Sequence, residues 1–239
     1  MSKNRVKKRF TSNVNVIDFQ TYAPQRKHRV TLLPRNKNQE TYLQKLQDDK
    51  KSIVFAIGPA GTGKTIMAVM HGIKLLQDGV IDKIIVTRPA VSVDEDLGFL
   101  PGTLNEKMAP WTRPIFDVLG EYYDQKSIES MLYEGTIEIS PLAYMRGRTF
   151  KNAYIIADEM QNATQNQMKM LLTRLGENSK MVVTGDLAQA DRLKDNGLID
   201  FINRVENRKY QHIDVARFDH KDIERHQAVA EVLKIYGDE

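Results

Sequence analysis

The stretch GPAGTGKT, residues 58–65, constrains the fold of this chain more than any other feature. It matches the pattern G-x-x-x-x-G-K-[ST] and lies between a short apolar run (52–57) and a segment with helical spacing (65–79). A strand, a glycine-rich turn and a helix in this order predict a phosphate-binding loop, because the turn aims successive backbone N–H groups at one anion. The alternative is a plain glycine-rich turn with a solvated lysine, and the flanking strand and helix argue against it.

The residues of this loop have distinct expected roles. Gly58, Gly61 and Gly63 permit the tight turn, and the N-terminus of the following helix adds partial positive charge. Lys64 is expected to neutralise the β- and γ-phosphates, and Thr65 to ligate Mg²⁺ through its hydroxyl. The residues expected to hold the nucleotide are Gly58, Pro59, Ala60, Gly61, Thr62, Gly63, Lys64 and Thr65.

Strands and helices are expected to alternate from residue 38 onward. Short continuous apolar runs are typical of buried parallel strands, and the alternation predicts an α/β fold with a mostly parallel sheet flanked by helices. The expected strands are 52–57, 83–89, 136–140, 153–158, 180–186 and 210–218, and the expected helices are 38–49, 65–79, 165–175, 198–207 and a final helix opening near Arg225 and His226. Residues 90–130 look irregular, with Pro101, Pro110 and Pro114 expected in loops ahead of one or two helices.

A phosphate-binding loop needs an acidic partner at the end of another buried strand. Asp158 ends the apolar run AYIIAD, where its carboxylate is expected to hold the metal ion. Glu159 follows and is expected to act as general base on the attacking water. The alternative is that both acids only cap a helix, with Thr164 as a further cap. An acid pair favours ATP hydrolysis over phosphate transfer to a small molecule, for which no acceptor site is evident.

Two glutamines are candidates for nucleotide recognition. Gln189 follows the strand MVVTGD and is expected to sense the γ-phosphate; an ordinary loop glutamine is the alternative. Gln39 lies on the helix before the loop, where its amide can pair with the N6/N7 edge of adenine. A solvent-facing polar residue is equally compatible with that position. The N-K-x-D pattern of GTP specificity is absent, so ATP is the expected nucleotide.

The charge is unevenly distributed along the chain. Residues 1–37 contain ten basic residues and one acid, a charge of +9, so residues 38–239 carry −5 of the total of +4. We therefore expect a basic, irregular leader over 1–37, with one short strand at 13–19, and an ATPase domain over 38–239. Such a leader can contact nucleic acid or remain a solvated tail. The chain contains no cysteine, which excludes disulfides and cysteine-ligated zinc and agrees with a cytoplasmic protein. No apolar run is long enough to span a membrane.

Taken together, GPAGTGKT, TRPAVSVDEDLGFLPG, MRGRTF, IIADEMQNAT, TGDLAQAD and DIERHQAV resemble the PhoH-like family of phosphate-starvation-inducible ATPases over roughly residues 35–236. The resemblance implies a single RecA-like core, similar to one half of a superfamily-one helicase, that binds ATP with Mg²⁺ and acts on RNA. It assigns the nucleotide roles above to Lys64, Thr65, Asp158, Glu159 and Gln189. Met160 stands where alanine is commoner. The short chain leads us to expect no fused nuclease, and it would suit a phage-encoded member.

Several arginines are candidates for an arginine finger. Arg225 is the preferred one, and Arg88, Arg146 and Arg148 are the others; pairing with Asp94, Glu95 or Asp96 is the alternative for Arg88 and the MRGRTF pair. Because one core lacks the second domain that supplies the finger in two-core helicases, Arg225 is expected to reach a neighbour's nucleotide in a homo-oligomeric ring, with a hexamer favoured by analogy. His226 is expected to be a packed histidine.

Two functions remain open from the sequence. The first is an ATPase stimulated by RNA or single-stranded DNA, helicase-like or remodelling. The second is a regulatory or scaffold ATPase whose nucleotide state sets its assembly, without strand separation. Aromatic residues in the irregular region could stack on bases, but their spacing favours the helix core: Trp111, Phe116, Tyr122 and Tyr123.

Overall fold

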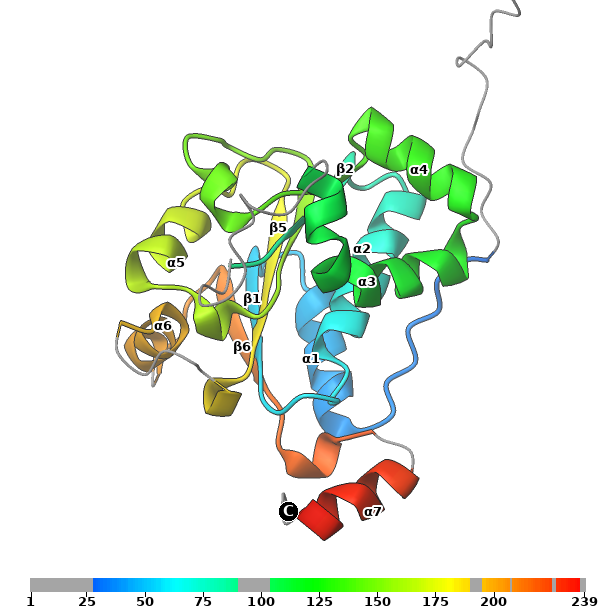
Figure 1. Ribbon diagram of the computed structural model, residues 1–239. Helices are drawn as coiled ribbons and strands as arrows, with labels where there is room; N and C mark the ends of the chain where they lie inside the picture. Colours follow the sequence, from blue (N-terminus) through cyan, green and yellow to red (C-terminus); the bar gives the residue numbers. More distant parts are fainter. Residues whose placement is uncertain (1–27, 90–103, 190–194, 207, 225–226, 237–239) are drawn as a thin grey trace, which may run out of the picture.

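The computed structural model describes residues 28–89, 104–189, 195–206, 208–224 and 227–236. Within them, the strands form one sheet in the order β3-β2-β4-β5-β1-β6, and every neighbouring pair runs parallel (Figure 1). The strands are β1 (Ile53–Ile57), β2 (Lys83–Thr87), β3 (Ile137–Ile139), β4 (Ala153–Ala157), β5 (Lys180–Gly185) and β6 (Ile213–Arg217). The expected α/β fold with a mostly parallel sheet is confirmed.

Helices cover both faces of this sheet (Figure 1). One face carries α1 (Lys37–Gln47), α2 (Lys64–Gln77), α3 (Leu104–Tyr122) and α4 (Gln125–Glu134), and the other carries α5 (Gln165–Leu172) and α6 (Gly197–Val205). Successive strand residues alternate between the two cores: Val54 packs on the α1–α4 side, whereas Phe55 packs on the α5–α6 side. Burial on both faces explains why the strands read as continuous apolar runs.

The prediction that Pro110 and Pro114 lie in loops is wrong, because both fall inside α3. Proline in a helix interior costs roughly 3 kcal/mol. Buried side chains later in the helix, such as Ile115 and Leu119, join the core on the α2 face, and this packing outweighs the cost.

The aromatic residues of this region belong to the core, as their spacing predicted. Tyr122 and Tyr123 are buried, and Phe116 packs against the same cluster. The side chain of Trp111 lies outside the described residues. Buried rings are not available to stack on nucleic-acid bases.

Residues 28–36, which the charge pattern assigned to the leader, pack against the folded body. Val30 is buried in the core, and its backbone N–H donates to Oε1 of Gln77 in α2 (3.2 Å). The folded unit therefore includes residues before 38. The strand expected at 13–19 lies outside the described residues.

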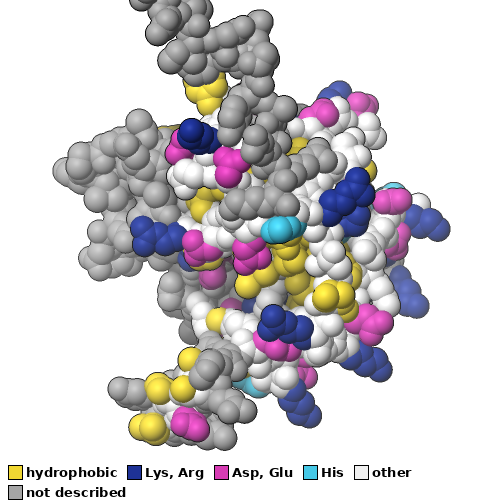
Figure 2. Space-filling model, turned by 90° about the vertical axis from the view of Figure 1, so that its right-hand side faces the viewer, with side chains coloured by type: hydrophobic (Ala, Val, Ile, Leu, Met, Phe, Trp, Pro, Cys, Tyr) yellow, Lys and Arg dark blue, Asp and Glu magenta, His cyan; other side chains and the backbone are white. Residues whose placement is uncertain are grey.

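The last helix, α7 (Gln227–Tyr236), begins after Arg225 and His226, which lie outside the described residues. It is set apart from the sheet and its covering helices (Figure 1). Figure 2 shows it below the body, with hydrophobic side chains on its surface. Val229, Val232 and Ile235 are 41%, 49% and 81% exposed. These three apolar side chains of α7 therefore remain accessible to solvent in the part of the chain that the structure describes.

Candidate nucleotide-binding site

The phosphate-binding loop joins the end of β1 to the start of α2. Gly58, Gly61 and Gly63 all have positive φ angles, of 146°, 82° and 84°, which only glycine adopts without strain. A Cβ on Gly58 would lie 2.4 Å from the carbonyl oxygen of Phe218, so a side chain there would force the loop away from the end of β6. Phe218, which follows β6, therefore packs closely against the first glycine of the loop.

Lys64 is folded back onto the loop that precedes it. Its Nζ donates to the carbonyl oxygens of Gly58 and Pro59, both at 2.6 Å, and the residue is buried. Desolvation by burial lowers the pKa of Lys64, while the nearby carboxylates, led by Asp186 and Glu159, oppose that shift. The ammonium is thus placed among acids at the centre of the loop.

Asp158 follows β4 and is buried at the point where three strands end. Its Oδ1 accepts hydrogen bonds from Oγ1 of Thr65 (2.7 Å) and from Oγ1 of Thr184 in β5. Its backbone N–H donates to the carbonyl oxygen of Thr87 in β2 (2.9 Å). The strand order brings this carboxylate to the first turn of α2, beside the hydroxyl of Thr65.

Glu159 adopts a left-handed backbone conformation, with φ of 54°. Its carboxylate accepts a short hydrogen bond from Nε2 of Gln161, and Oε1 of Gln161 accepts from the backbone N–H of Asp186 (3.2 Å). A non-glycine residue with positive φ costs energy and is often found at functional sites. The alternative that the acids cap α5 is wrong, because Thr164 caps that helix through a capping box with Gln167.

These groups line a cavity of about 800 Å³ that extends from the phosphate-binding loop to residues before α1. Five acidic and two basic side chains line it, a surplus of three negative charges: Glu121, Asp158, Glu159, Asp186 and Glu224 against Arg35 and Lys64. The lining also includes apolar side chains, those of Leu33, Pro34, Ile66 and Met70. The cavity is of the size that small-molecule and cofactor sites have.

Both candidate glutamines line this cavity. Gln189 ends the short helix η4 (Leu187–Gln189) and its side chain is exposed. Gln39 is buried rather than facing solvent; its Oε1 accepts from the backbone N–H of Arg35 (2.8 Å), and its Nε2 donates to the carbonyl oxygen of Thr62 (3.2 Å). Gln39 therefore braces the phosphate-binding loop from α1.

The arginine candidates differ in how they are engaged. Arg148 forms a two-pronged ion pair with Glu138 of β3 and stacks 4.6 Å from the ring centroid of Phe150. This hydrogen bond raises the pKa of Arg148 and lowers that of Glu138. Arg146 is exposed, Arg88 is half-buried at the end of β2, and Arg225 lies outside the described residues.

Comparison with known proteins identifies the family. The family model described as PhoH-like protein matches residues 31–237 of this chain. The chain belongs to the PhoH-like family. It is 44% identical over 212 residues to a PhoH-like protein of Mycobacterium tuberculosis, covering 87% of this chain and 58% of that protein. It is 47% identical over 189 residues to a PhoH-like protein of Bacillus subtilis, covering 78% and 59%. Against Protein PhoH of Escherichia coli it is 40% identical over 243 residues, covering 98% and 67%.

This PhoH-like chain spans less than two thirds of the length of the first two of these relatives. Among solved structures it is similar to a Sulfolobus solfataricus SWI2/SNF2 ATPase core in complex with dsDNA, with a TM-score of 0.43 and 14% identity over 70% of this chain and 34% of that one. It is also similar to the Pif1 helicase of Candida albicans, with a TM-score of 0.39 and 17% identity over 85% and 44%.

The donor set of the PhoH-like site suits Mg²⁺. The Thr65 hydroxyl and the Asp158 carboxylate are both oxygen donors and lie 2.7 Å apart. Mg²⁺ in proteins is held by one or two carboxylates together with substrate phosphates. Two protein oxygens of this kind fit an ion that is held together with phosphates.

Four residues of the site were not assigned a role from the sequence. Thr184 and Gln161 orient the two acids, while Arg35 and Glu224 form an ion pair (3.4 Å) in the lining of the cavity. Thr184 could have been found, because it lies one residue before the end of the strand that precedes Gln189. Gln161 and Glu224 lie within the stretches IIADEMQNAT and DIERHQAV, and Arg35 lies outside every quoted stretch. The sequence alone assigned none of the three a contact, so only the folded chain shows them.

Proposed function

We propose that this PhoH-like chain binds ATP with Mg²⁺ and hydrolyses it, and that RNA or single-stranded DNA stimulates the reaction. The observation that carries this proposal is the meeting of Lys64, Thr65, Asp158 and Glu159 at one end of a nucleotide-sized cavity. Lysine, hydroxyl and carboxylate are the groups with which P-loop proteins hold phosphates and metal.

Each group has a defined task in hydrolysis. Lys64 exchanges its bonds to the Gly58 and Pro59 carbonyls for phosphate oxygens and balances their charge. Thr65 and Asp158 hold Mg²⁺, which when bound screens the phosphates. Glu159, fixed by Gln161, accepts the proton of the attacking water.

The apolar part of the lining is the proposed site of the base. Leu33, Pro34, Ile66 and Met70 supply the apolar side chains, and Gln39 contacts the phosphate-binding loop at the carbonyl oxygen of Thr62. Each end of the Gln39 amide has one hydrogen-bonding position left, because Oε1 has a second lone pair and Nε2 a second hydrogen. These can pair with N6 and N7 of adenine. Gln189 is proposed to contact the γ-phosphate.

The surplus of three negative charges makes metal-free ATP a poor ligand for this cavity. Binding should therefore require Mg²⁺ and fall when the ion is chelated. The test of the whole proposal is phosphate release measured with RNA, with single-stranded DNA and without polymer, at low salt. Glu159→Gln should bind ATP but lose about 10²–10⁴-fold in kcat, and Lys64→Ala should lose binding. Equal rates with and without polymer would contradict the coupling; no phosphate release would contradict hydrolysis.

A second candidate function is a nucleotide-controlled assembly without strand separation. The exposed apolar face of α7, with Val229, Val232 and Ile235, favours it, because such a face is normally covered by a partner. A cytoplasmic homo-oligomeric ring, in which Arg225 reaches a neighbour's nucleotide, is part of this proposal. Mass in solution with and without ATP, for the native chain and Arg225→Ala, tests it.

A further inference from the structure

A second cavity lies along β6, at the edge of the sheet. It has a volume of about 470 Å³ and is lined by Lys45, Lys51, Val205, Glu206, Arg208, Lys209, Tyr210, Ile213, Asp214, Val215 and Arg217; we call it the β6 groove. Lys51 precedes β1, whereas the phosphate-binding loop follows it. At about 3.3 Å per residue this end of the groove is roughly 20 Å from the loop along the strand, whereas Arg217, at the other end of β6, is the register partner of Ile57, the last residue before the loop. The two cavities have no lining residue in common, so the β6 groove is separate from the nucleotide cavity.

Five basic and two acidic side chains line the β6 groove, a surplus of three positive charges. This is the reverse of the nucleotide cavity, which has a negative surplus. The groove also differs from residues 38–239 as a whole, which carry a net charge of −5. A local positive surplus on a negative body favours an anionic ligand at this place.

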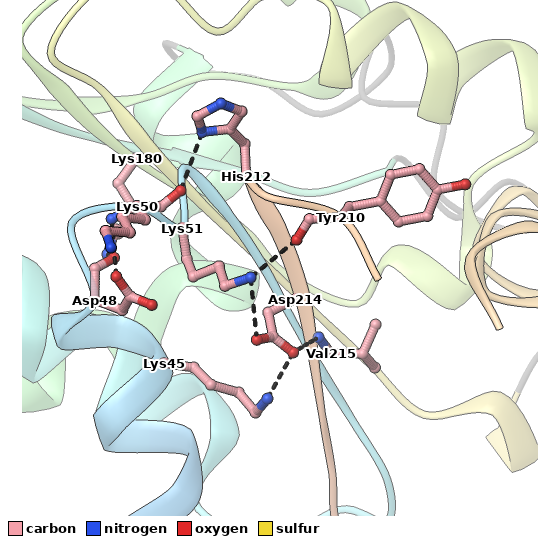
Figure 3. A network of polar contacts seen from close by, with 9 residues as sticks. All are labelled: Lys45, Asp48, Lys50, Lys51, Lys180, Tyr210, His212, Asp214 and Val215. Atoms are coloured by element: carbon pink, nitrogen blue, oxygen red, sulfur yellow. Dashed lines mark hydrogen bonds and ion pairs between the residues drawn. The ribbon is translucent and has the colours of Figure 1, made fainter. Parts of the chain in front are cut away.

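On one wall of the groove, a single carboxylate holds two lysines (Figure 3). Asp214 accepts from Nζ of Lys45 (2.5 Å), and Nζ of Lys51 lies 3.6 Å from its other oxygen. Lys51 also donates to the carbonyl oxygen of Tyr210 (2.9 Å). Burial alone would raise the pKa of Asp214, but the hydrogen bond from Lys45 and the charge of Lys51 lower it overall. One negative charge cannot neutralise two ammonium groups, so a positive charge is left in a fixed position.

Further along the groove, the connection from α6 to β6 supplies two more cations. Arg208 and Lys209 are exposed, and neither has an acidic partner among the residues that the structure describes. Arg217, by contrast, is paired with Glu206 (3.1 Å). Next to them the side chain of Tyr210 projects away from Asp214 (Figure 3), and the residue is 37% exposed. The groove thus combines unpaired cations with an accessible aromatic ring.

We propose that the β6 groove binds the backbone of a single-stranded nucleic acid. Phosphates contact the Lys45–Lys51 pair and the side chains of Arg208 and Lys209, while a base stacks on Tyr210. Cationic grooves with aromatic rings bind single strands in this way. Lysines can also prevent an edge strand from pairing with another chain. That role does not require a carboxylate such as Asp214 to hold two lysines inside a groove. An acidic peptide would use the cations but not the ring.

The test measures binding of a fluorescent 12-nucleotide RNA and DNA strand by anisotropy, without ATP, on the full chain. The double variant Arg208→Glu/Lys209→Glu should bind about ten-fold more weakly, and its log Kd should change less steeply with log salt, by roughly 1.4 for two lost phosphate contacts. The matched control is Lys126→Glu/Lys169→Glu, which makes the same charge change on exposed residues of α4 and α5. The basic residues within 1–37 are unchanged in both double variants, so any binding that they contribute is the same in both.

A third variant, Tyr210→Ala, separates stacking from charge. It should weaken binding several-fold and leave the salt slope unchanged. The proposal is overturned if the groove and control double variants bind alike, or if poly-glutamate displaces the labelled strand as well as unlabelled RNA does at equal charge. Thermal melts verify that all variants fold. Because no step requires ATP, a chain that binds RNA through the groove but releases no phosphate would contradict the proposed hydrolysis and leave this inference standing.

Discussion

The backbone N–H of Glu224 donates a hydrogen bond to the carbonyl oxygen of Gly61, at 3.0 Å. This bond ties the segment after β6 to the tip of the phosphate-binding loop. The side chain of Glu224 reaches Arg35 across the mouth of the nucleotide cavity. The shape of the loop therefore depends on residues from both ends of the described core.

Removing that backbone donor should weaken nucleotide binding. Glu224→Pro lacks the N–H, and the loss of one hydrogen bond of about 1 kcal/mol corresponds to roughly five-fold in Kd. Glu224→Ala keeps the N–H and loses only an exposed ion pair, so its affinity should stay within about two-fold. Titration with a fluorescent ATP analogue compares them. Equal affinities of the two variants would show that the bond to Gly61 does not shape the site.

The Thr184 hydroxyl should matter through Asp158. Thr184→Val removes the donor with little change in volume, so half-maximal ATPase activity should require several-fold more Mg²⁺, and stability should fall by about 1 kcal/mol. Thr87→Val is the matched control, because the Thr87 hydroxyl is equally buried and has no hydrogen-bond partner among the residues that the structure describes. A Mg²⁺ titration of both variants measures the difference. If Thr87→Val shifts the requirement as much, the hydroxyl of Thr184 has no special role.

Gln39 should affect both the loop and the choice of base. Gln39→Ala leaves the buried Thr62 carbonyl oxygen without its donor, which costs about 1–3 kcal/mol of stability. It should also reduce the preference for ATP over GTP, measured as the ratio of their Kd values. Asn38→Ala is the control, since its amide bonds Asp222 (2.7 Å) and does not line the cavity. An unchanged ratio in Gln39→Ala would restrict this residue to bracing the loop.

Arg148 should stabilise the fold rather than act as a finger. Arg148→Ala should lower the free energy of unfolding by about 1 kcal/mol at pH 7. The pair with Arg148 lowers the pKa of Glu138 below 4.5, so its stabilisation is complete above that value and is lost as the pH falls through the lowered pKa. The effect should therefore fade in acid. Arg146→Ala, which alters an exposed residue nearby, should change neither the free energy of unfolding nor its dependence on pH. A large loss of kcat in Arg148→Ala, with unchanged stability, would favour a finger.

His71 should make stability depend on pH below neutrality. It is buried beside the hydroxyl of Tyr154 (3.2 Å), and desolvation, with the charges of Lys180 and Lys74, lowers its pKa from 6.5 to about 3. Between these values the unfolded chain binds a proton that the folded chain does not, so stability rises with pH. From pH 7 to pH 5 this group alone removes about 2 kcal/mol. Measured by urea unfolding, His71→Gln should lose less stability between pH 7 and pH 5 than the native chain does. An equal loss in both proteins would contradict the lowered pKa of His71.

The order of residues alone predicts the phosphate-binding loop, the acid pair and the parallel sheet. The loop is set by glycine spacing between a strand and a helix, and Asp158 by its place at the end of an apolar run. Both are local properties, which residue order records directly. The same local reading failed at Pro110 and Pro114, where core packing maintains a helix through two prolines.

The side chains that support these motifs are brought to them by the folding of the sheet. Thr184 meets Asp158 because β5 lies beside β4, and Glu224 meets Gly61 because β6 lies beside β1. The β6 groove likewise joins the end of α1 to the start of β6. Such contacts depend on the order of strands in the sheet, and residues far apart in the chain carry no spacing signal that reveals it.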